Sequence, residues 1–291
     1  MNPSDITIII PTFNGLPLLK KHLPQVIKCS RNGTKIIVID NGSSDGTEDY
    51  LISKYPKTVQ CLRNERNLFF PIAVNQGFKA ASTDLVVLIN NDVHPLKGYL
   101  ETAIRHFTDK SIFAVTFDEA SSSWPQVTWR GKLQYLRGED KGRPRLSAWA
   151  SGGSAIFRKS VWDELGGLDE IYSPGYWEDI DIGWRAWKAG YQIIWEPKAK
   201  VIHQHESSFS LINRDYLNLI KQRNELIFNW KNITDPEMRH EHFFYLAYQT
   251  LLHPGYLKVI LSALKIIKNA RPLTKATRTD REILSLINKP V

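Results

Sequence analysis

A short segment of the sequence, residues 176–185 (YWEDIDIGWR), gathers three carboxylates within four positions. Glu178, Asp179 and Asp181 lie at the start of a predicted helix, where the first backbone N–H groups provide partial positive charge. Arg185 follows Asp181 by four residues, so the two side chains can pair along one face of the helix. The segment is therefore either a charged helix start with a local ion pair, or a site where one carboxylate takes up a proton in a reaction.

Polar residues also follow three predicted strands in the first third of the chain, at 12–15, 40–47 and 90–92. Each group comes directly after an apolar run that is typical of a strand buried on both faces. In a doubly wound sheet, ligands bind beyond the carboxyl ends of the strands. Neither a GxGxxG sequence nor a Walker loop is present, so the sequence supports neither a dinucleotide site nor a P-loop.

Strands and helices alternate through residues 1–95, which predicts an α/β fold with a mostly parallel, Rossmann-like sheet. The predicted strands there cover 6–10, 35–40, 59–63 and 84–89, and the predicted helices cover 16–29, 48–54 and 71–81. Residues 96–206 are mixed, with two short apolar stretches near their end, at 193–195 and 201–202. Residues 207–291 are predicted to be helical. We expect these three parts to be two halves of one domain and a C-terminal helical extension.

The chain is basic, with a net charge of +8 and a pI of about 9.3. This favours an anionic partner, which could be nucleic acid, a nucleotide or an anionic membrane. The two cysteines, Cys29 and Cys61, lack metal-ligand spacing and are expected to be reduced in a cytoplasmic protein. There is no signal-peptide pattern and no apolar run near the roughly 18 residues of a membrane span, so we expect a soluble or peripheral protein.

Most of the net positive charge of the chain lies at its C-terminal end. Residues 256–291 hold eight Lys and Arg against two Asp and Glu. Within 256–269, Leu257, Ile260, Leu261, Leu264 and Ile267 fall on one helical face, and three lysines lie off it. Two interpretations remain open. The segment is either a tail helix docked on its own domain or an interfacial helix held by anionic lipid.

Seven motifs in order along the chain resemble glycosyltransferase family 2, the enzymes of GT-A fold that use nucleotide sugars. The sequence is most similar to the branch with rhamnosyltransferases and galactofuranosyltransferases. The motifs cover residues 6–205: IIIPTFNG at 8–15, VIDNGSSDGT at 38–47, LINNDV at 88–93, GG at 152–153, GGLDE at 166–170, WEDID at 177–181 with Arg185, and VIH at 201–203. The C-terminal region matches the family only loosely, through Arg223 and Asn224.

The resemblance implies specific roles for residues of this sequence. Asp179 would be the general base of an inverting transfer, and Asp92 and His203 would hold Mn²⁺ or Mg²⁺, with His205 as a weaker alternative ligand. Asp40 would accept from the imide N–H of uracil or thymine. Further nucleotide or donor contacts are expected from Thr12, Asn14, Gly15, Asn67, Asn75, Asn91 and Asp92, and acceptor contacts from Gly152, Gly153, Trp177, Glu178 and Asp181. The alternatives for Glu178 and Asp181 are to orient Asp179 or to pair with Arg185, and Trp177 could instead pack in the core.

The sequence departs from the family pattern at two places. Asn67 is usually followed by x-Gly-Phe-Ala, but here Phe69 occupies the glycine position, which implies an altered sugar or ribose pocket. The family's DxD motif is reduced to Asn90-Asn91-Asp92, which leaves one firm metal carboxylate.

These motifs predict a metal-dependent inverting glycosyltransferase of cell-surface polysaccharide synthesis. By resemblance, residues 1–95 would bind the nucleotide sugar and residues 96–206 the acceptor. dTDP-rhamnose is the favoured donor, with UDP-sugars also possible. The acceptor would be a saccharide or lipid-linked saccharide at the cytoplasmic face of the membrane. One competing hypothesis is an inactive protein of the same fold that only binds glycans. A nucleic-acid-binding protein is disfavoured, because the basic excess is concentrated in 256–291 and no nucleic-acid motif is present.

Overall fold

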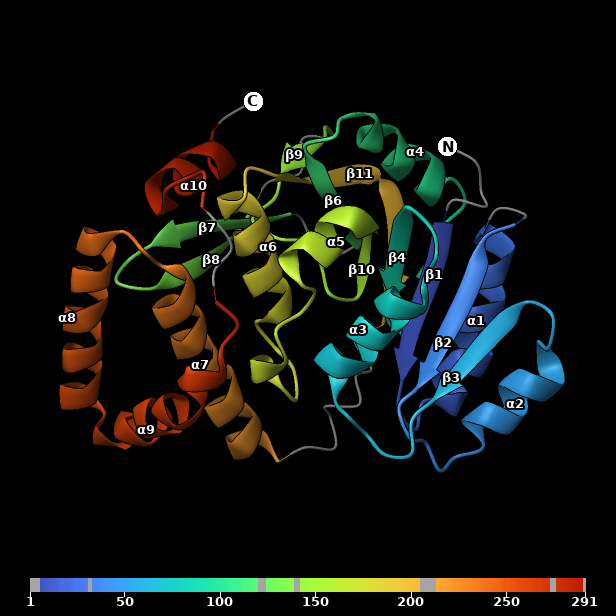
Figure 1. Ribbon diagram of the computed structural model, residues 1–291, viewed down its shortest axis with the longest axis horizontal. Coiled ribbons are helices and arrows are strands. Elements are labelled where there is room, and N and C mark those ends of the chain that lie inside the picture. The colour runs from blue at the N-terminus through green and yellow to red at the C-terminus, as the bar shows by residue number, and fades with distance from the viewer. Residues whose placement is uncertain are drawn as a thin grey trace.

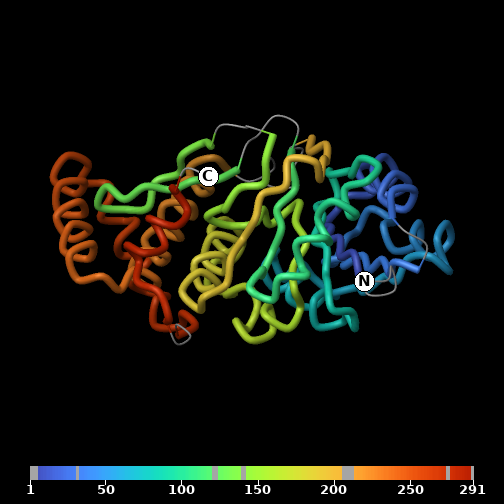
Figure 2. Tube along the Cα trace, turned by 90° about the horizontal axis from the view of Figure 1, so that it is seen from above, coloured from blue at the N-terminus to red at the C-terminus, as the bar shows by residue number. Residues whose placement is uncertain are grey.

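The computed structural model of the chain describes residues 6–30, 33–119, 124–138, 142–204, 213–272 and 276–289. One large sheet carries helices on both faces, and a group of C-terminal helices lies at one end (Figure 1). Figure 2 shows the molecule from above. It is elongated, with the C-terminal helices at one end and the first strands and helices at the other.

The strands, in chain order, are β1 (Ile6–Thr12), β2 (Lys35–Asp40), β3 (Val59–Arg63), β4 (Leu85–Ile89), β5 (Val93–Pro95), β6 (Ile112–Glu119), β7 (Pro125–Trp129), β8 (Leu133–Arg137), β9 (Arg145–Leu146), β10 (Ser154–Arg158) and β11 (Gln192–His203). The α-helices are α1 (Leu16–Cys29), α2 (Thr47–Lys54), α3 (Phe70–Ala80), α4 (Tyr99–Ile104), α5 (Lys159–Leu165), α6 (Glu178–Lys188), α7 (Arg214–Asn232), α8 (Pro236–Leu252), α9 (Leu257–Ile266) and α10 (Asp280–Ile287).

The large sheet has the order β3-β2-β1-β4-β10-β6-β11-β5, and β9 also pairs with β11. β1 is parallel to β2 and β4, and β2 is parallel to β3, whereas β10 is antiparallel to β4 and β6. The predicted α/β fold with a mostly parallel sheet is confirmed. Strands from both expected halves share this one sheet, and β7 and β8 form a separate hairpin.

β1 shows why these residues form a central strand. All seven of its residues are buried, and β-branched isoleucines fill four of the positions. Successive side chains point to opposite faces of a strand. Accordingly, Ile8 and Ile10 pack in a core with residues of α1 and α4, whereas Ile9 packs with residues of α3 on the other face.

Parallel pairing brings the polar strand ends together. Thr12, the last residue of β1, lies opposite Asp40, the last residue of β2. The N–H of Asn41 then donates to the carbonyl of Thr12 at 2.8 Å. The loops after β1, β2 and β4 therefore lie along one edge of the sheet, where the sequence predicted a ligand site.

The structure differs from the predicted elements in two places. The two apolar stretches near residues 193 and 201 belong to one strand, β11, because a register shift between Glu196 and Lys200 keeps both parts paired with β6. The sequence predicted helical structure across 207–291 but gave no separate bounds for the last helix, α10. It begins at a capping box, in which Thr279 and Glu282 satisfy each other's backbone N–H groups.

The helices α7 to α10 make up the C-terminal region. α7 packs beside α6 and α9, and Asn288, just after α10, donates to the carbonyl of Val127 in β7. No helix in the described part of the chain is long and apolar enough to cross a bilayer.

Candidate active site

The loop after β1 meets the loop after β4. Asn91 Nδ2 donates to Thr12 Oγ1 at 2.8 Å. A Cβ added at Gly15 would collide with both of these side chains, so the close approach requires glycine. Three of the residues predicted to bind the donor are therefore in contact with one another.

The loop after β1 also interlocks with the loop after β2. The N–H of Asn14 donates to Ser43 Oγ at 2.9 Å, and the N–H of Ser44 donates to Asn14 Oδ1 at 2.8 Å. Asn67 joins the same region, because its Oδ1 accepts from Asn41 Nδ2 at 2.8 Å. These contacts build a polar rim at the carboxyl end of β2.

Asp40 lies beneath this rim and is fully buried. Its Oδ1 accepts from the N–H of Ser43, and its Oδ2 accepts from Arg63 Nη1, both at 2.9 Å. Each carboxylate oxygen has a second lone pair. A nucleobase can reach Asp40 only if the Arg63 side chain, which is 39% exposed, moves aside. The role of Asp40 in base recognition thus stays a prediction.

Two residues near α3 bear on the expected donor contacts. Asn75 Nδ2 donates to the carbonyl of Leu168, and its Oδ1 accepts from the N–H of Leu168, both at 2.9 Å. Its amide ties α3 to the loop after α5, and the donor contact expected of Asn75 stays a prediction. Phe69, at the glycine position of the family, has φ of 70° and an exposed ring. Glycine adopts this backbone conformation readily and phenylalanine does not, so the backbone at Phe69 is strained.

Asp92 and His203 come together at the end of β11. His203 Nε2 lies 3.2 Å from Asp92 Oδ1, and His203 Nδ1 lies 3.1 Å from Glu119 Oε1. Burial alone would lower the pKa of His203, but its interactions with the two carboxylates outweigh burial and raise the pKa to about 9. Glu119 was not singled out from the sequence, since a glutamate at a strand end carries no distinctive pattern. His205 lies outside the described residues.

The donor set of Asp92 and His203 fits a divalent cation. Two adjacent ligands of an octahedral ion with bonds of about 2.1 Å are about 3 Å apart, close to the 3.2 Å separation found here. No group of three or more His, Cys, Asp or Glu side chains within the described ranges has the geometry of a metal site. Such a cation would need further ligands besides these two side chains.

Glu119 links this pair to the segment that contains the two glycines. Its Oε1 accepts from Ser154 Oγ at 2.6 Å and from Ser151 Oγ at 3.3 Å. The next N–H along the chain, that of Gly152, donates to Asp179 Oδ2 at 3.2 Å. Asp92, His203 and Asp179 therefore lie at one site, joined by Glu119 and the backbone around Ser151.

Asp179 occupies the second position of α6. Its Oδ1 accepts from the N–H of Ile180 at 2.8 Å, and its Oδ2 accepts from Gly152. Burial raises the pKa of Asp179, and the negative charge of Glu119 adds to that effect, although the two N–H groups act in the opposite direction. Gly153 lets the backbone lie against the side-chain amide of Asn90, because a Cβ at this position would collide with that amide.

The other two carboxylates of the acidic segment have different surroundings. Burial raises the pKa of Glu178 well above its usual range, and the charge of Asp179 raises it further. Asp181 is also buried, but its Oδ2 accepts from Arg185 Nε at 2.7 Å and its Oδ1 from Lys231 Nζ at 2.8 Å. The acceptor contact expected of Asp181 does not fit this burial. The ion pair with Arg185, the alternative drawn from the i, i+4 spacing, is what the structure shows.

The loop before α6 is held in an unusual conformation. Tyr176 and Trp177 both have positive φ angles, of 73° and 78°. Asn224 of α7 is fully buried, and its Nδ2 donates to the carbonyls of Tyr172, Gly175 and Tyr176 at 2.9 to 3.0 Å. Trp177 packs against Phe228, with ring centroids 5.2 Å apart, so core packing accounts for the contacts that it makes. α7 therefore positions the loop that leads into Asp179.

A pocket of about 330 Å³ adjoins Glu119 and Ser151. Aromatic rings form much of its wall. Tyr135 and Trp149 have centroids 5.8 Å apart, and Trp195 contributes from β11. Apolar ring faces beside a few polar groups are suited to binding sugars. The abundance of tryptophan was a signal for such a pocket, but the sequence did not show which rings would line it.

Comparisons with known proteins identify relatives of this chain. A pre-mycofactocin glycosyltransferase of Mycobacterium tuberculosis is 27% identical over 210 residues, which cover 70% of this chain but only 43% of the relative. An N-acetylglucosaminyl-diphospho-decaprenol L-rhamnosyltransferase of the same organism is 27% identical over 241 residues, covering 70% of this chain and 77% of the relative.

Among solved structures, GalNAc-T7 with UDP, GalNAc and Mn²⁺ superposes with a TM-score of 0.67 over 92% of this chain and 55% of that one, at 16% identity. At that identity the likeness concerns the fold, and it supports the predicted GT-A architecture. The model of the family described as "Glycosyl transferase family 2" matches residues 7–166, more than half of the sequence. The chain belongs to glycosyl transferase family 2.

Proposed function

We propose that the protein is an inverting glycosyltransferase that moves a sugar from a nucleotide diphosphate sugar to a hydroxyl of a saccharide or lipid-linked saccharide. The observation that supports this most is the continuous contact from Asp92 and His203 through Glu119 to Asp179. The proposed base and the pair proposed to hold a divalent cation are thus linked through Glu119. A general base and a bound cation both promote transfer of a sugar from a diphosphate.

The proposed reaction is a single displacement at the anomeric carbon. Asp179 accepts the proton of the acceptor hydroxyl, and the hydroxyl oxygen bonds to the anomeric carbon as the bond to the diphosphate oxygen breaks. Attack on the face opposite the diphosphate inverts the configuration. Asp92 and His203 would hold Mn²⁺ or Mg²⁺, which when bound offsets the negative charge of the leaving diphosphate.

The donor is proposed to be dTDP-rhamnose, with a UDP-sugar as the alternative. Support comes from the motifs shared with the rhamnosyltransferase branch and from the relative whose name is an L-rhamnosyltransferase. Asp40, once Arg63 moves aside, would accept from the imide N–H that uracil and thymine share. Phe69 stands where the family has glycine and would narrow the space for the sugar or ribose.

The acceptor is proposed to bind in the aromatic pocket lined by Tyr135, Trp149 and Trp195, beside Ser151 and Glu119. From there an acceptor hydroxyl would approach Asp179 past Gly152. The relative named as an N-acetylglucosaminyl-diphospho-decaprenol L-rhamnosyltransferase supports a lipid-linked acceptor. We place this acceptor at the cytoplasmic face of a membrane.

A panel of nucleotide sugars tests the proposal. We expect dTDP-rhamnose with Mn²⁺ to raise the melting temperature and to be hydrolysed slowly without acceptor. A shift with GDP-sugars alone would contradict the role of Asp40. If no nucleotide sugar causes either a shift or hydrolysis, the protein is not a transferase of this kind.

Glu119 provides a prediction about metal binding. It faces His203 Nδ1 and so directs Nε2 toward Asp92. Because outer partners of this kind orient metal-binding histidines, Glu119→Gln is expected to weaken Mn²⁺ binding by about 10- to 100-fold. Titration of Mn²⁺ followed by electron paramagnetic resonance, with a nucleoside diphosphate present, measures this. Glu164→Gln, a carboxylate on α5 bonded to Tyr191, is the control and should bind Mn²⁺ like the wild type.

A further inference from the structure

The C-terminal helices expose an unusual amount of apolar surface. On α8, Phe244, Tyr248 and Leu251 recur at i, i+4 and i+7, and on α9, Leu257, Leu261 and Leu264 repeat the same spacing. These six side chains, which we call the α8–α9 surface, are between 49% and 79% exposed. Apolar side chains that recur on the exposed face of a helix often mark an interaction site.

The α8–α9 surface is not needed to attach these helices to the protein. α9 already buries Val259 and Ala263 on its opposite side, in the large core that includes Leu226 and Ile227 of α7. The periodic leucines were expected to face either the domain or a lipid surface. The structure shows a helix that docks through one set of residues and leaves Leu257, Leu261 and Leu264 in solvent.

Taken together, the C-terminal part of α8 and the whole of α9 carry only positive charge, whereas Glu237 and Glu241 lie in the first turns of α8. Residues 242–279 contain six Lys and Arg and no Asp or Glu. Lys258, Lys265 and Lys268 are all exposed, and they lie on α9 and the short turn that follows it. Exposed leucines flanked by lysines are the pattern of a helix that lies in the interface of an anionic membrane. A protein partner would need a strongly acidic face to match this charge.

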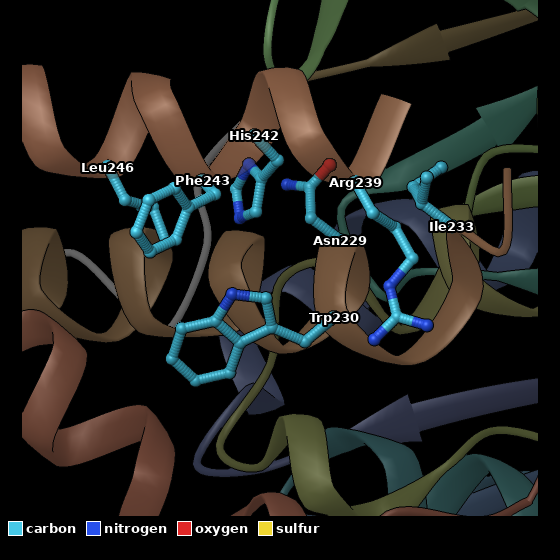
Figure 3. A pocket seen from close by; sticks show the side chains of 7 residues that line it. All are labelled: Asn229, Trp230, Ile233, Arg239, His242, Phe243 and Leu246. Atoms are coloured by element: carbon cyan, nitrogen blue, oxygen red, sulfur yellow. The ribbon is translucent and has the colours of Figure 1, made fainter. Parts of the chain in front are cut away.

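A cavity of about 290 Å³ adds depth to this region. Figure 3 shows Trp230 of α7 across from Phe243 and Leu246 of α8, with Arg239 near one end. Phe243 lines the cavity and is also 65% exposed, so the cavity adjoins the outer side of α8. Its walls are mostly apolar, and it lies beside the N-terminal half of α8.

The position of α9 is consistent with this use. In Figure 1, α9 lies at the lower edge of the molecule, the same edge toward which the carboxyl ends of β1 and β2 point. A bilayer surface lying along that edge would contact α9 and the C-terminal end of α8. The candidate active site would then open near the bilayer.

We propose that the α8–α9 surface attaches the protein to the surface of a bilayer that contains anionic phospholipid. The leucines of α9 and the aromatic rings of α8 enter the boundary between headgroups and acyl chains, and the three lysines contact lipid phosphates. This inference does not depend on the proposed transfer reaction, because it rests on exposed residues outside the candidate site.

Vesicle sedimentation with the full chain tests the inference. Wild type is expected to sediment with vesicles of mixed phosphatidylglycerol and phosphatidylcholine, to be partly released at high salt, and to bind pure phosphatidylcholine weakly. The triple variant Leu257→Gln, Leu261→Gln, Leu264→Gln should lose binding to the mixed vesicles by at least about tenfold. Lys258→Gln, Lys265→Gln, Lys268→Gln should lose at least about tenfold on the mixed vesicles only, since each lysine near such a surface contributes about fivefold.

The control is Ile52→Gln on α2, which replaces an equally exposed apolar side chain at the other end of the molecule. It should bind vesicles like the wild type, and circular dichroism should show all variants folded. The proposal would be overturned if the wild type did not bind anionic vesicles, or if the triple variants bound them as well as Ile52→Gln does. A dimer in solution that the leucine variant makes monomeric, without vesicle binding, would instead assign the surface to a second copy of the chain.

Discussion

Replacement of Asp179 by Asn is expected to lower kcat by about a thousandfold, within the range of 10² to 10⁴ that a general base contributes. The asparagine keeps an oxygen that can accept from the N–H of Gly152, so the local structure should persist. What it loses is the ability to take the acceptor proton. Donor binding, measured by thermal shift with the nucleotide sugar, should be unchanged.

Glu178 provides the matched control, because it is the adjacent carboxyl group. Burial raises the pKa of Glu178 well above its usual range, and the charge of Asp179 raises it further, so the neutral form of Glu178 is favoured. Glu178→Gln resembles that neutral form, and its kcat should stay within about tenfold of wild type. A larger loss in Glu178→Gln than in Asp179→Asn would transfer the role of base to Glu178.

The pH dependence of the wild type follows from the same surroundings. Asp179 works only when it is ionised, and its raised pKa places the acid limb of kcat/KM above the ordinary aspartate value of about 3.9. Activity should therefore fall as the pH is lowered through that pKa. The residual activity of Asp179→Asn should lack this limb, as a stopped assay of released nucleoside diphosphate over a pH series would show.

The fold could be predicted because local pattern and burial agree. The runs at 6–10, 35–40 and 84–89 are apolar and rich in β-branched residues, and all three became buried strands of the parallel part of the sheet. β11 was harder to predict, since its two apolar stretches are separated by Glu196 to Lys200. Only the pairing with β6 across a register shift shows that they form a single strand.

The candidate site was predicted in part. Motifs located Asp92, Asp179 and His203, which come from three separate elements. They could not reveal Glu119, Ser151 and Ser154, because these residues matter through contacts made across the sheet. Helix geometry alone could have indicated that Asp181 does not share the role of Asp179. Residues two positions apart on a helix are rotated by about 200° from each other, so Asp179 and Asp181 could not both face one cleft.

Replacement of the buried Asp181 by Asn is expected to reduce the free energy of unfolding by about 3–5 kcal/mol. Asparagine retains the size of the side chain and can still accept from Asn232 and Tyr172. It removes the negative charge that offsets Arg185 and Lys231, both of which are buried beside it. Breaking one side of a buried ion pair is costly because the remaining charge has no water to solvate it. Urea unfolding followed by circular dichroism measures the loss.

Asp163 on α5 provides the contrast, because it also forms an i, i+4 ion pair, with Lys159, but is 53% exposed. Asp163→Asn should change stability by less than about 1 kcal/mol.

The difference in unfolding free energy between wild type and Asp181→Asn should also depend on pH. Arg185 and Lys231 outweigh burial and lower the pKa of Asp181 in the folded state, so its contribution is complete above about pH 4 and is lost as the pH falls toward that lowered pKa. Equal, small losses in both variants would mean that the Asp181 network does not hold α6 in place. The position of Asp179 would then depend on the loop clamped by Asn224 instead.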